Sequence, residues 1–242
     1  MIVMMTDFGL TGPYLGQVRA VLHRDAPGVV VIDLFADAPA FDPQASAYLL
    51  AAYVEVFSAG TVFLCVIDPG VGGERRPCIV EADRRWFVGP DNGLFEMVIR
   101  RARTARAWHI DWQPQRLSAT FHGRDLFAPV AARLACGAPP PGIPIALEAV
   151  RRPVWPDDLE QIVYIDGYGN AMTGVRAASI PADASLSVAG VRVERARTYS
   201  DLPEGAVFCY ENANGLMEIA VNCGRAADVL GVRVGTPVAL EL

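Results

Sequence analysis

The 242-residue chain contains no lysine and only three histidines, His23, His109 and His122. Without lysine there is no Walker A loop and no kinase strand lysine, so Asp7-Phe8-Gly9 does not mark a kinase magnesium loop. The chain has no H-E-x-x-H sequence and its histidines are too scattered for a zinc site, so we expect no metal. It also lacks the G-x-S-x-G elbow, which disfavours a Ser-His-Asp hydrolase.

The five cysteines are odd in number, widely spaced and free of C-x-x-C pairs. Zinc ribbons and disulfide frameworks are therefore disfavoured, and reduced thiols in a cytoplasmic protein are expected. The net charge of −6 disfavours a nucleic-acid partner. No apolar run has the length of a membrane span, and the first residues lack a signal-peptide pattern. We expect a cytoplasmic protein with no membrane partner.

Short apolar runs alternate with helical spacing in the first part of the chain. Strands are predicted at 2–5, 29–34 and 62–67, with helices at 14–24 and 43–56 between them. This order predicts a parallel sheet with right-handed crossovers. A hairpin-like pair at 78–82 and 86–88, a helix at 94–102, a strand at 107–110 and a helix at 126–135 follow.

The composition changes at residues 137–144, where four prolines fall in GAPPPGIP. Such a stretch is typical of a stiff connector. We predict an α/β domain over 1–140, a Pro-rich linker over 141–156 and a smaller β-barrel-like domain over 157–242. The fold class is α/β, with a mostly parallel first domain. Strands of the second domain are predicted at 161–165, 185–188, 191–194, 207–210, 217–221 and 238–242.

The stretch over residues 62–76 has the layout of an active-site edge. Its buried strand ends at Asp68, and a glycine-rich loop then delivers Arg75. Thr6-Asp7 follows another strand, and His122 precedes a helix. Because the carboxyl ends of parallel strands share one edge, we expect these groups to converge. The alternative is that each Asp only shapes a turn.

Two polar turns in the second half of the chain follow predicted strands. They are Asp166-Gly167-Tyr168-Gly169-Asn170 and Asn212-Ala213-Asn214-Gly215. Asn and Asp beside Gly are common in turns, so composition alone gives these segments no function.

Taken together, the motifs resemble one family. TDFG, VIDPGVGGERR, FVGPDNGL, TFHGRDLFAP, DGYGN and NANGLMEIAVN run in order from Thr6 to Asn222. They resemble the S-adenosyl-L-methionine (SAM) hydroxide adenosyltransferases, relatives of the fluorinase and chlorinase enzymes. The resemblance implies hydrolysis of SAM to adenosine and L-methionine by a water-derived hydroxide at ribose C5′. It also implies no cofactor, and a homotrimer with the active site between subunits.

The resemblance also implies roles for single residues. It makes Asp68, Arg75 and His122 the catalytic set. The family's methionine-carboxylate serine falls on Ala213, which leaves three alternatives: Asn214 makes that contact, a backbone amide makes it, or recognition of the methionine end is looser. The implied substrate contacts are Asp7 to the ribose diol, Phe41 beside the ribose, Asp166 to the methionine ammonium and Asn170 to adenine, with Phe8, Asn212 and Asn214 as further substrate-binding residues.

Two alternatives to hydrolysis remain open. Fluorinase-type sequences resemble this chain but carry Tyr at the position of Asp68 and a halide-contacting Ser at that of Gly123, so water is favoured over halide. The first alternative is a halide-using 5′-halogenase, and the second is a non-catalytic sensor of SAM or adenosine. Within the hydrolase interpretation, either Asp68 or His122 accepts the proton from water.

Overall fold

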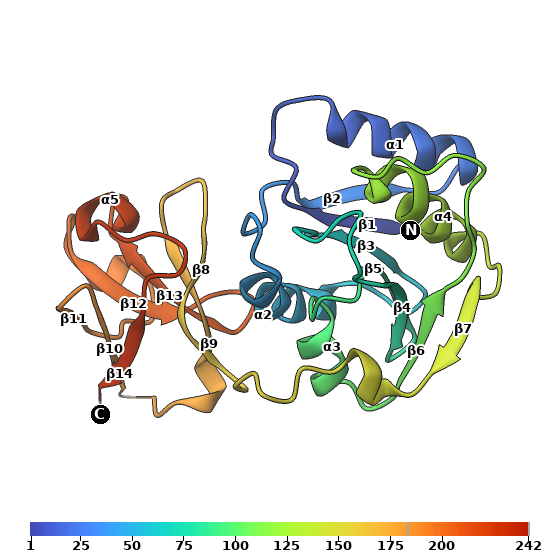
Figure 1. The fold of residues 1–242 in the computed structure, drawn as a ribbon. Coiled ribbons are helices and arrows are strands. Elements are labelled where there is room, and N and C mark those ends of the chain that lie inside the picture. Colours follow the sequence, from blue (N-terminus) through green and yellow to red (C-terminus); the bar gives the residue numbers. More distant parts are fainter. Residues whose placement is uncertain (183, 242) are drawn as a thin grey trace. The chain divides into compact units, whose positions relative to one another are not determined.

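The computed structural model describes residues 1–182 and 184–241; Leu242, the last residue of a predicted strand, lies outside them. The chain forms two compact units, Met1–Val154 and Trp155–Leu242 (Figure 1). The predicted domain limits of 1–140, 141–156 and 157–242 remain predictions.

The first unit contains a mixed sheet of seven strands in the order β2-β1-β3-β5-β4-β6-β7. β2, β1, β3 and β5 run parallel, whereas β4 is antiparallel to β5 and β6, and β7 is antiparallel to β6. The predicted α/β class is confirmed, with its parallel strands on one side of the sheet. The strands are β1 Ile2–Thr6, β2 Val31–Phe35, β3 Val62–Val66, β4 Pro77–Ala82, β5 Arg85–Pro90, β6 Ala105–Ile110 and β7 Gly142–Ile145.

Helices cover both faces of this sheet. α1 (Tyr14–Asp25) packs with α4 (Ala128–Ala135) on one face, and α2 (Pro43–Tyr53) packs with α3 (Glu96–Arg101) on the other (Figure 1). α2 begins as its sequence predicts, because the Asp42 side chain accepts a hydrogen bond from the Ala45 N–H at 2.9 Å. β1 and β3 are buried along their whole length, so the sheet centre is the core of the unit.

Two segments of the first unit differ from the prediction. The predicted helix at 126–135 begins earlier, with a π-helical turn over Gly123–Phe127 that leads into α4. The Pro-rich stretch is not only a connector, because it contains strand β7. β7 lies at the edge of the sheet, where a proline without an N–H group is tolerated.

The second unit contains two antiparallel sheets, one in the order β12-β13-β9-β8 and one in the order β11-β10-β14. The predicted strands at 185–188 and 191–194 form an antiparallel hairpin through Ala189-Gly190, and both turn residues have positive φ, 50° and 77°. Strand β9 and helix α5 were not predicted. The elements are β8 Leu159–Ile165, β9 Ala171–Arg176, β10 Ser185–Val188, β11 Val191–Val193, β12 Val207–Glu211, β13 Leu216–Val221, α5 Ala226–Leu230 and β14 Val238–Glu241.

A helix that spans a membrane requires a minimum length and hydrophobicity. None of the helices within 1–182 and 184–241 is both long and apolar enough to cross a membrane.

Candidate active site

Two carboxylates lie at one edge of the sheet in the first unit. Asp7 directly follows β1, and Asp68 lies two residues beyond β3. β1 and β3 pair in parallel with Thr6 opposite Val66, so both chains leave the sheet at the same edge. This is the edge at which open α/β sheets bind ligands.

The guanidinium of Arg75 joins Asp68 to His122. Its Nε donates to Asp68 Oδ1 at 2.9 Å, and its Nη2 donates to Asp68 Oδ2. The same Nη2 lies 2.8 Å from Nδ1 of His122. The side chains of Arg75 and Asp68 are only 10% and 4% exposed, so this ion pair is largely removed from water. Two distant segments of the chain, one with Asp68 and Arg75 and one with His122, therefore meet.

The contact with Arg75 defines the protonation of His122. A guanidinium only donates, so Nδ1 accepts and the neutral ring carries its proton on Nε2. Burial, followed by the positive charge of Arg75, lowers the pKa of His122. The site therefore favours a neutral imidazole with an N–H group available on its far side.

A cavity of about 100 Å³ lies beside these groups. It brings together five of the predicted site residues and adds apolar walls and one glycine. A cavity of this size holds a few water molecules but is far smaller than the ~300–1,000 Å³ of a typical small-molecule pocket. Its lining is Asp7, Phe8, Phe41, Val66, Asp68, Val71, Thr120, Phe121, His122 and Gly123.

Three aromatic rings pack beside the cavity. Phe8 and Phe121 are 5.8 Å apart between centroids, and Tyr14 lies 5.4 Å from Phe121 and 6.0 Å from Phe8. Phe127 lies beneath the Arg75 guanidinium, 5.3 Å from its central carbon to the ring centroid. Tyr14 was not among the predicted site residues; its place at the start of α1, shortly after the TDFG loop, is the sequence signal that points to it.

Phe41 is held in an unusual conformation next to Asp7. Its φ is 60°, in the left-handed region, and 78% of the residue is exposed. Its backbone N–H donates to Asp7 Oδ2 at 3.1 Å. A bulky residue with positive φ is strained, and such strain is commonest at functional sites. Burial raises the pKa of Asp7, partly offset by this hydrogen bond.

Two glycines allow the loops of the site to approach closely. A Cβ atom at Gly72 would lie 2.4 Å from the carbonyl oxygen of Ala119, so the Arg75 loop is pressed onto the segment before His122. A Cβ atom at Gly123 would lie 3.1 Å from Cζ of Phe8 and 3.4 Å from Cγ1 of Val66. Both contacts leave room only for glycine unless a neighbour shifts.

The second unit brings Asp166 and Asn170 together. Oδ1 of Asp166 accepts the N–H groups of Tyr168 and Asn170, both at 2.9 Å, and Asn170 Nδ2 donates to Asp166 Oδ2 at 3.2 Å. Both side chains line a cavity of about 630 Å³ together with Tyr199, Tyr210, Glu218 and others.

Asn212 and Asn214 are placed differently. Asn212 is buried; its Oδ1 accepts the N–H of Asn214 at 2.9 Å, and its Nδ2 donates to Glu218 at 2.9 Å. It lines a separate cavity with Ala213, whereas Asn214 lines neither. Glu218 was not predicted. It lines the Asp166 cavity but is only 2% exposed, and this burial raises its pKa.

Within 1–182 and 184–241 no group of three or more His, Cys, Asp or Glu side chains is arranged to hold a metal ion.

Comparison with known proteins places this geometry in context. Residues 2–143 match the model of the SAM hydroxide adenosyltransferase N-terminal domain, and residues 160–239 match that of the C-terminal domain. A solved structure from Thermotoga maritima, described as an uncharacterized conserved protein, covers 100% of both chains with a TM-score of 0.89 and 29% identity. A solved structure of a conserved hypothetical protein from Thermus thermophilus aligns over 99% of both chains with a TM-score of 0.77 and 38% identity.

Curated relatives include proteins named (R)-S-adenosyl-L-methionine hydrolase. The one from Thermus thermophilus is 39% identical, covering 98% of this chain and 97% of its own. The one from Salinispora arenicola is also 39% identical, covering 95% and 93%. A protein named fluorinase, from Nocardia brasiliensis, is more distant at 21% identity over 100% of this chain and 96% of its own. With both domain models matched in order over most of its length, the chain belongs to the SAM hydroxide adenosyltransferase family.

Proposed function

We propose that this protein hydrolyses SAM to adenosine and L-methionine by attack of a water-derived hydroxide on ribose C5′. The observation that carries the proposal is the contact of Arg75 with both Asp68 and His122 beside a cavity that holds a few water molecules. Relatives at 39% identity that are named (R)-S-adenosyl-L-methionine hydrolase support it.

The reaction requires no general acid at sulfur, because a sulfonium is already a good leaving group. The C5′–S bond breaks with its electron pair going to sulfur, and the new C5′–O bond comes from water. Positioning the two reactants can contribute ~7–11 kcal/mol in favourable cases. No metal or redox cofactor is required for this step.

The Asp68–Arg75–His122 set activates the water in this proposal. The positive charge of Arg75 stabilises the developing hydroxide. Because Nδ1 of His122 is occupied by Arg75, its Nε2–H donates to the water oxygen and orients it. Asp68 retains lone pairs beyond those bound by Arg75, and it accepts the proton as the C–O bond forms.

Asp7 and the aromatic residues hold the ribose. The Asp7 carboxylate accepts both ribose hydroxyls, which fixes C5′ relative to the water. Phe8 and Phe41 give this site an apolar wall. The positive charge on sulfur fades during the reaction, so an apolar wall disfavours the ground state more than the transition state.

Residues of the second unit hold the two ends of the substrate in this proposal. Asp166 binds the methionine ammonium, Asn170 binds adenine, and the 212–214 turn binds the methionine carboxylate through Asn214 or a backbone amide. The first-unit cavity of about 100 Å³ is too small for the whole substrate, which supports a composite site. We propose a cytoplasmic homotrimer in which the second unit of a neighbouring subunit completes each site.

One assay tests the reaction and both alternatives. Purified protein is incubated with SAM in oxygen-18 water, with and without excess chloride or fluoride, and the products are analysed by mass spectrometry. Hydrolysis at C5′ gives methionine and adenosine labelled at its 5′ oxygen. A 5′-halo-adenosine product would make the protein a halogenase, and bound but intact SAM would make it a sensor.

Mixed oligomers test the composite site. Asp68→Asn and Asp166→Ala chains, each inactive alone, are co-expressed with different tags and co-purified. A site between subunits recovers activity, because some sites combine an intact first unit with an intact second unit. If the mixed sample stays inactive, the site lies within one chain.

A further inference from the structure

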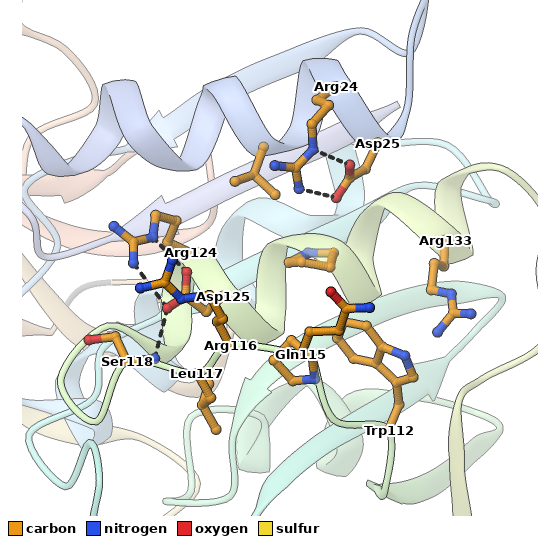
Figure 2. Close-up of a pocket in the computed structure, with 13 residues that line it drawn as sticks. Arg24, Asp25, Trp112, Gln115, Arg116, Leu117, Ser118, Arg124, Asp125 and Arg133 are labelled. Atoms are coloured by element: carbon orange, nitrogen blue, oxygen red, sulfur yellow. Dashed lines mark hydrogen bonds and ion pairs between the residues drawn. The ribbon is translucent and has the colours of Figure 1, made fainter.

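A second, larger cavity of about 980 Å³ lies on the first unit, apart from the candidate active site. Figure 2 shows its lining, which comes from the end of α1, from the π-helical turn and α4, and from the irregular segment between β6 and that turn. It shares no residue with the 100 Å³ cavity that contains Asp68 and His122. The proposed hydrolysis uses none of its residues.

The charges of this cavity do not cancel. Four arginines and two aspartates line it. Each aspartate is engaged by the arginine beside it in the sequence: Arg24 Nε donates to Asp25 Oδ1 at 2.6 Å, and Arg124 Nε donates to Asp125 Oδ1 at 2.6 Å (Figure 2). A second N–H of each arginine donates to the other carboxylate oxygen, at 2.9 and 3.0 Å. Both carboxylates are thus neutralised inside the cavity.

Two arginines remain without a carboxylate. Across the part of the chain that the structure describes, Arg116 and Arg133 form no ion pair. The Arg133 guanidinium lies over the indole of Trp112, 5.2 Å from its central carbon to the ring centroid. Trp112 in turn packs against the core, so it is a fixed platform for that guanidinium. In a chain whose net charge is −6, this cavity retains two uncompensated positive charges.

An arginine that is stacked on an aromatic ring and has no carboxylate partner is well suited to bind phosphate. Its planar fork donates two parallel hydrogen bonds to a phosphate, and stacking on an aromatic ring fixes the fork in advance. We propose that this cavity binds a phosphate-bearing small molecule, with the phosphate held by Arg133 on Trp112 and with Arg116 contributing a second positive charge elsewhere in the same cavity. The volume leaves space for an organic group attached to the phosphate, and Gln115 and Ser118 offer further polar contacts at the rim (Figure 2).

Calorimetric titration of the full-length protein with inorganic pyrophosphate tests this proposal. We expect saturable binding that weakens as salt is added, because the contacts are between charges. The Arg116→Ala/Arg133→Ala double variant should raise the Kd at least tenfold. Quenching or enhancement of tryptophan fluorescence on binding, absent in Trp112→Phe, locates the ligand at the indole.

Three controls separate this site from other sources of anion binding. Arg103→Ala/Arg233→Ala removes two exposed arginines elsewhere and should leave the Kd within twofold. Arg75→Ala should also retain binding. Circular dichroism melts check that all variants are folded. The proposal is overturned if the wild-type protein does not bind pyrophosphate at millimolar concentration, if the double variant binds as well as wild type, or if Arg75→Ala alone abolishes binding.

Discussion

Nη2 of Arg75 lies 2.8 Å from Nδ1 of His122 while the same guanidinium is forked onto Asp68. One cation therefore fixes the orientation of both a carboxylate and an imidazole. Removing any of the three groups changes the other two, which makes the set testable by substitution.

The first prediction concerns the carboxylate of the set. Asp68→Asn keeps the shape of the side chain but removes its charge and basicity. We expect the single-turnover rate of SAM hydrolysis to fall by roughly 10²–10⁴, because general-base assistance contributes an effect of that size. Equilibrium binding of SAM should change much less.

Asp111→Asn is the matched control, since Asp111 is exposed and does not line this cavity. Rapid-quench kinetics with excess enzyme measure both variants. A single-turnover rate of Asp68→Asn equal to that of wild type would remove Asp68 from the chemical step.

The second prediction concerns pH and His122. Burial, then the charge of Arg75, lowers its pKa, so the ring stays neutral as the pH falls below the ordinary value of about 6.5. An imidazolium cannot accept from Arg75, so kcat/KM should fall only once the pH drops below the lowered pKa. At a pH between the lowered pKa of the folded protein and the ordinary pKa of the unfolded chain, the unfolded chain binds more protons than the folded protein. The free energy of unfolding should therefore decrease as the pH falls through this range and then level off.

The ring-proton shifts of His122 in an NMR titration measure this pKa directly, with His122→Gln for assignment. This measurement also separates His122 from Asp7, whose protonation contributes to loss of activity in acid. An inflection for His122 at or above the ordinary value of about 6.5 is incompatible with the buried, Arg75-bonded ring.

The third prediction concerns Gly123, the position at which fluorinase-type sequences carry serine. A Cβ atom there would meet Phe8 at 3.1 Å, so Gly123→Ser must displace that ring. We expect slower hydrolysis and no 5′-halo-adenosine in excess fluoride or chloride. Gly16→Ser is the control, since a Cβ atom at Gly16 meets nothing within 4 Å. Halogenated product from Gly123→Ser would show that one hydroxyl suffices to recruit halide.

The fourth prediction concerns the loop contact at Gly72. Its φ is +77°, and a Cβ atom would lie 2.4 Å from the Ala119 carbonyl oxygen. Gly28 has a similar φ of +81° but open space around it. Gly28→Ala should cost about 1 kcal/mol of unfolding free energy from backbone strain alone, and Gly72→Ala should cost on the order of 3 kcal/mol.

Gly72→Ala should in addition lower kcat, because it separates the loop of Arg75 from the segment leading to His122. Urea denaturation and steady-state kinetics compare the two variants. Equal losses of stability with equal kcat values would mean that the loop contact has no role in positioning Arg75.

The sheet edge was predictable because local signals and tertiary structure agree there. Ile2–Thr6 and Val62–Val66 are continuous apolar runs that end just before Asp7 and Asp68, so strand type and site location follow from the same pattern. The shared sheet edge also predicted that His122 would converge with Asp68 and Arg75. The family motifs were needed only to assign the three residues to one catalytic set, because 47 residues separate Arg75 from His122.

Other elements were missed for physical reasons. Strand β9 contains Gly174, which weakens a strand prediction; the glycine is needed because a Cβ atom there would lie 2.6 Å from Cβ of Leu159 on β8. Strand β7 is hidden by prolines that only an edge position tolerates. The stacking of Arg133 on Trp112 has no sequence pattern, since helix α4 and the loop after β6 bring these two side chains together.

The π-helical turn Gly123–Phe127 has a consequence for how relatives of this chain are aligned. A π-turn holds an extra residue compared with an α-turn. Deleting that residue would restore ordinary winding and swing the imidazole of His122 by roughly 100° around the helix axis. The direction of the His122 side chain thus depends on the number of residues in this turn as well as on their type. A homologue that keeps every motif but lacks this insertion would point its histidine away from the arginine.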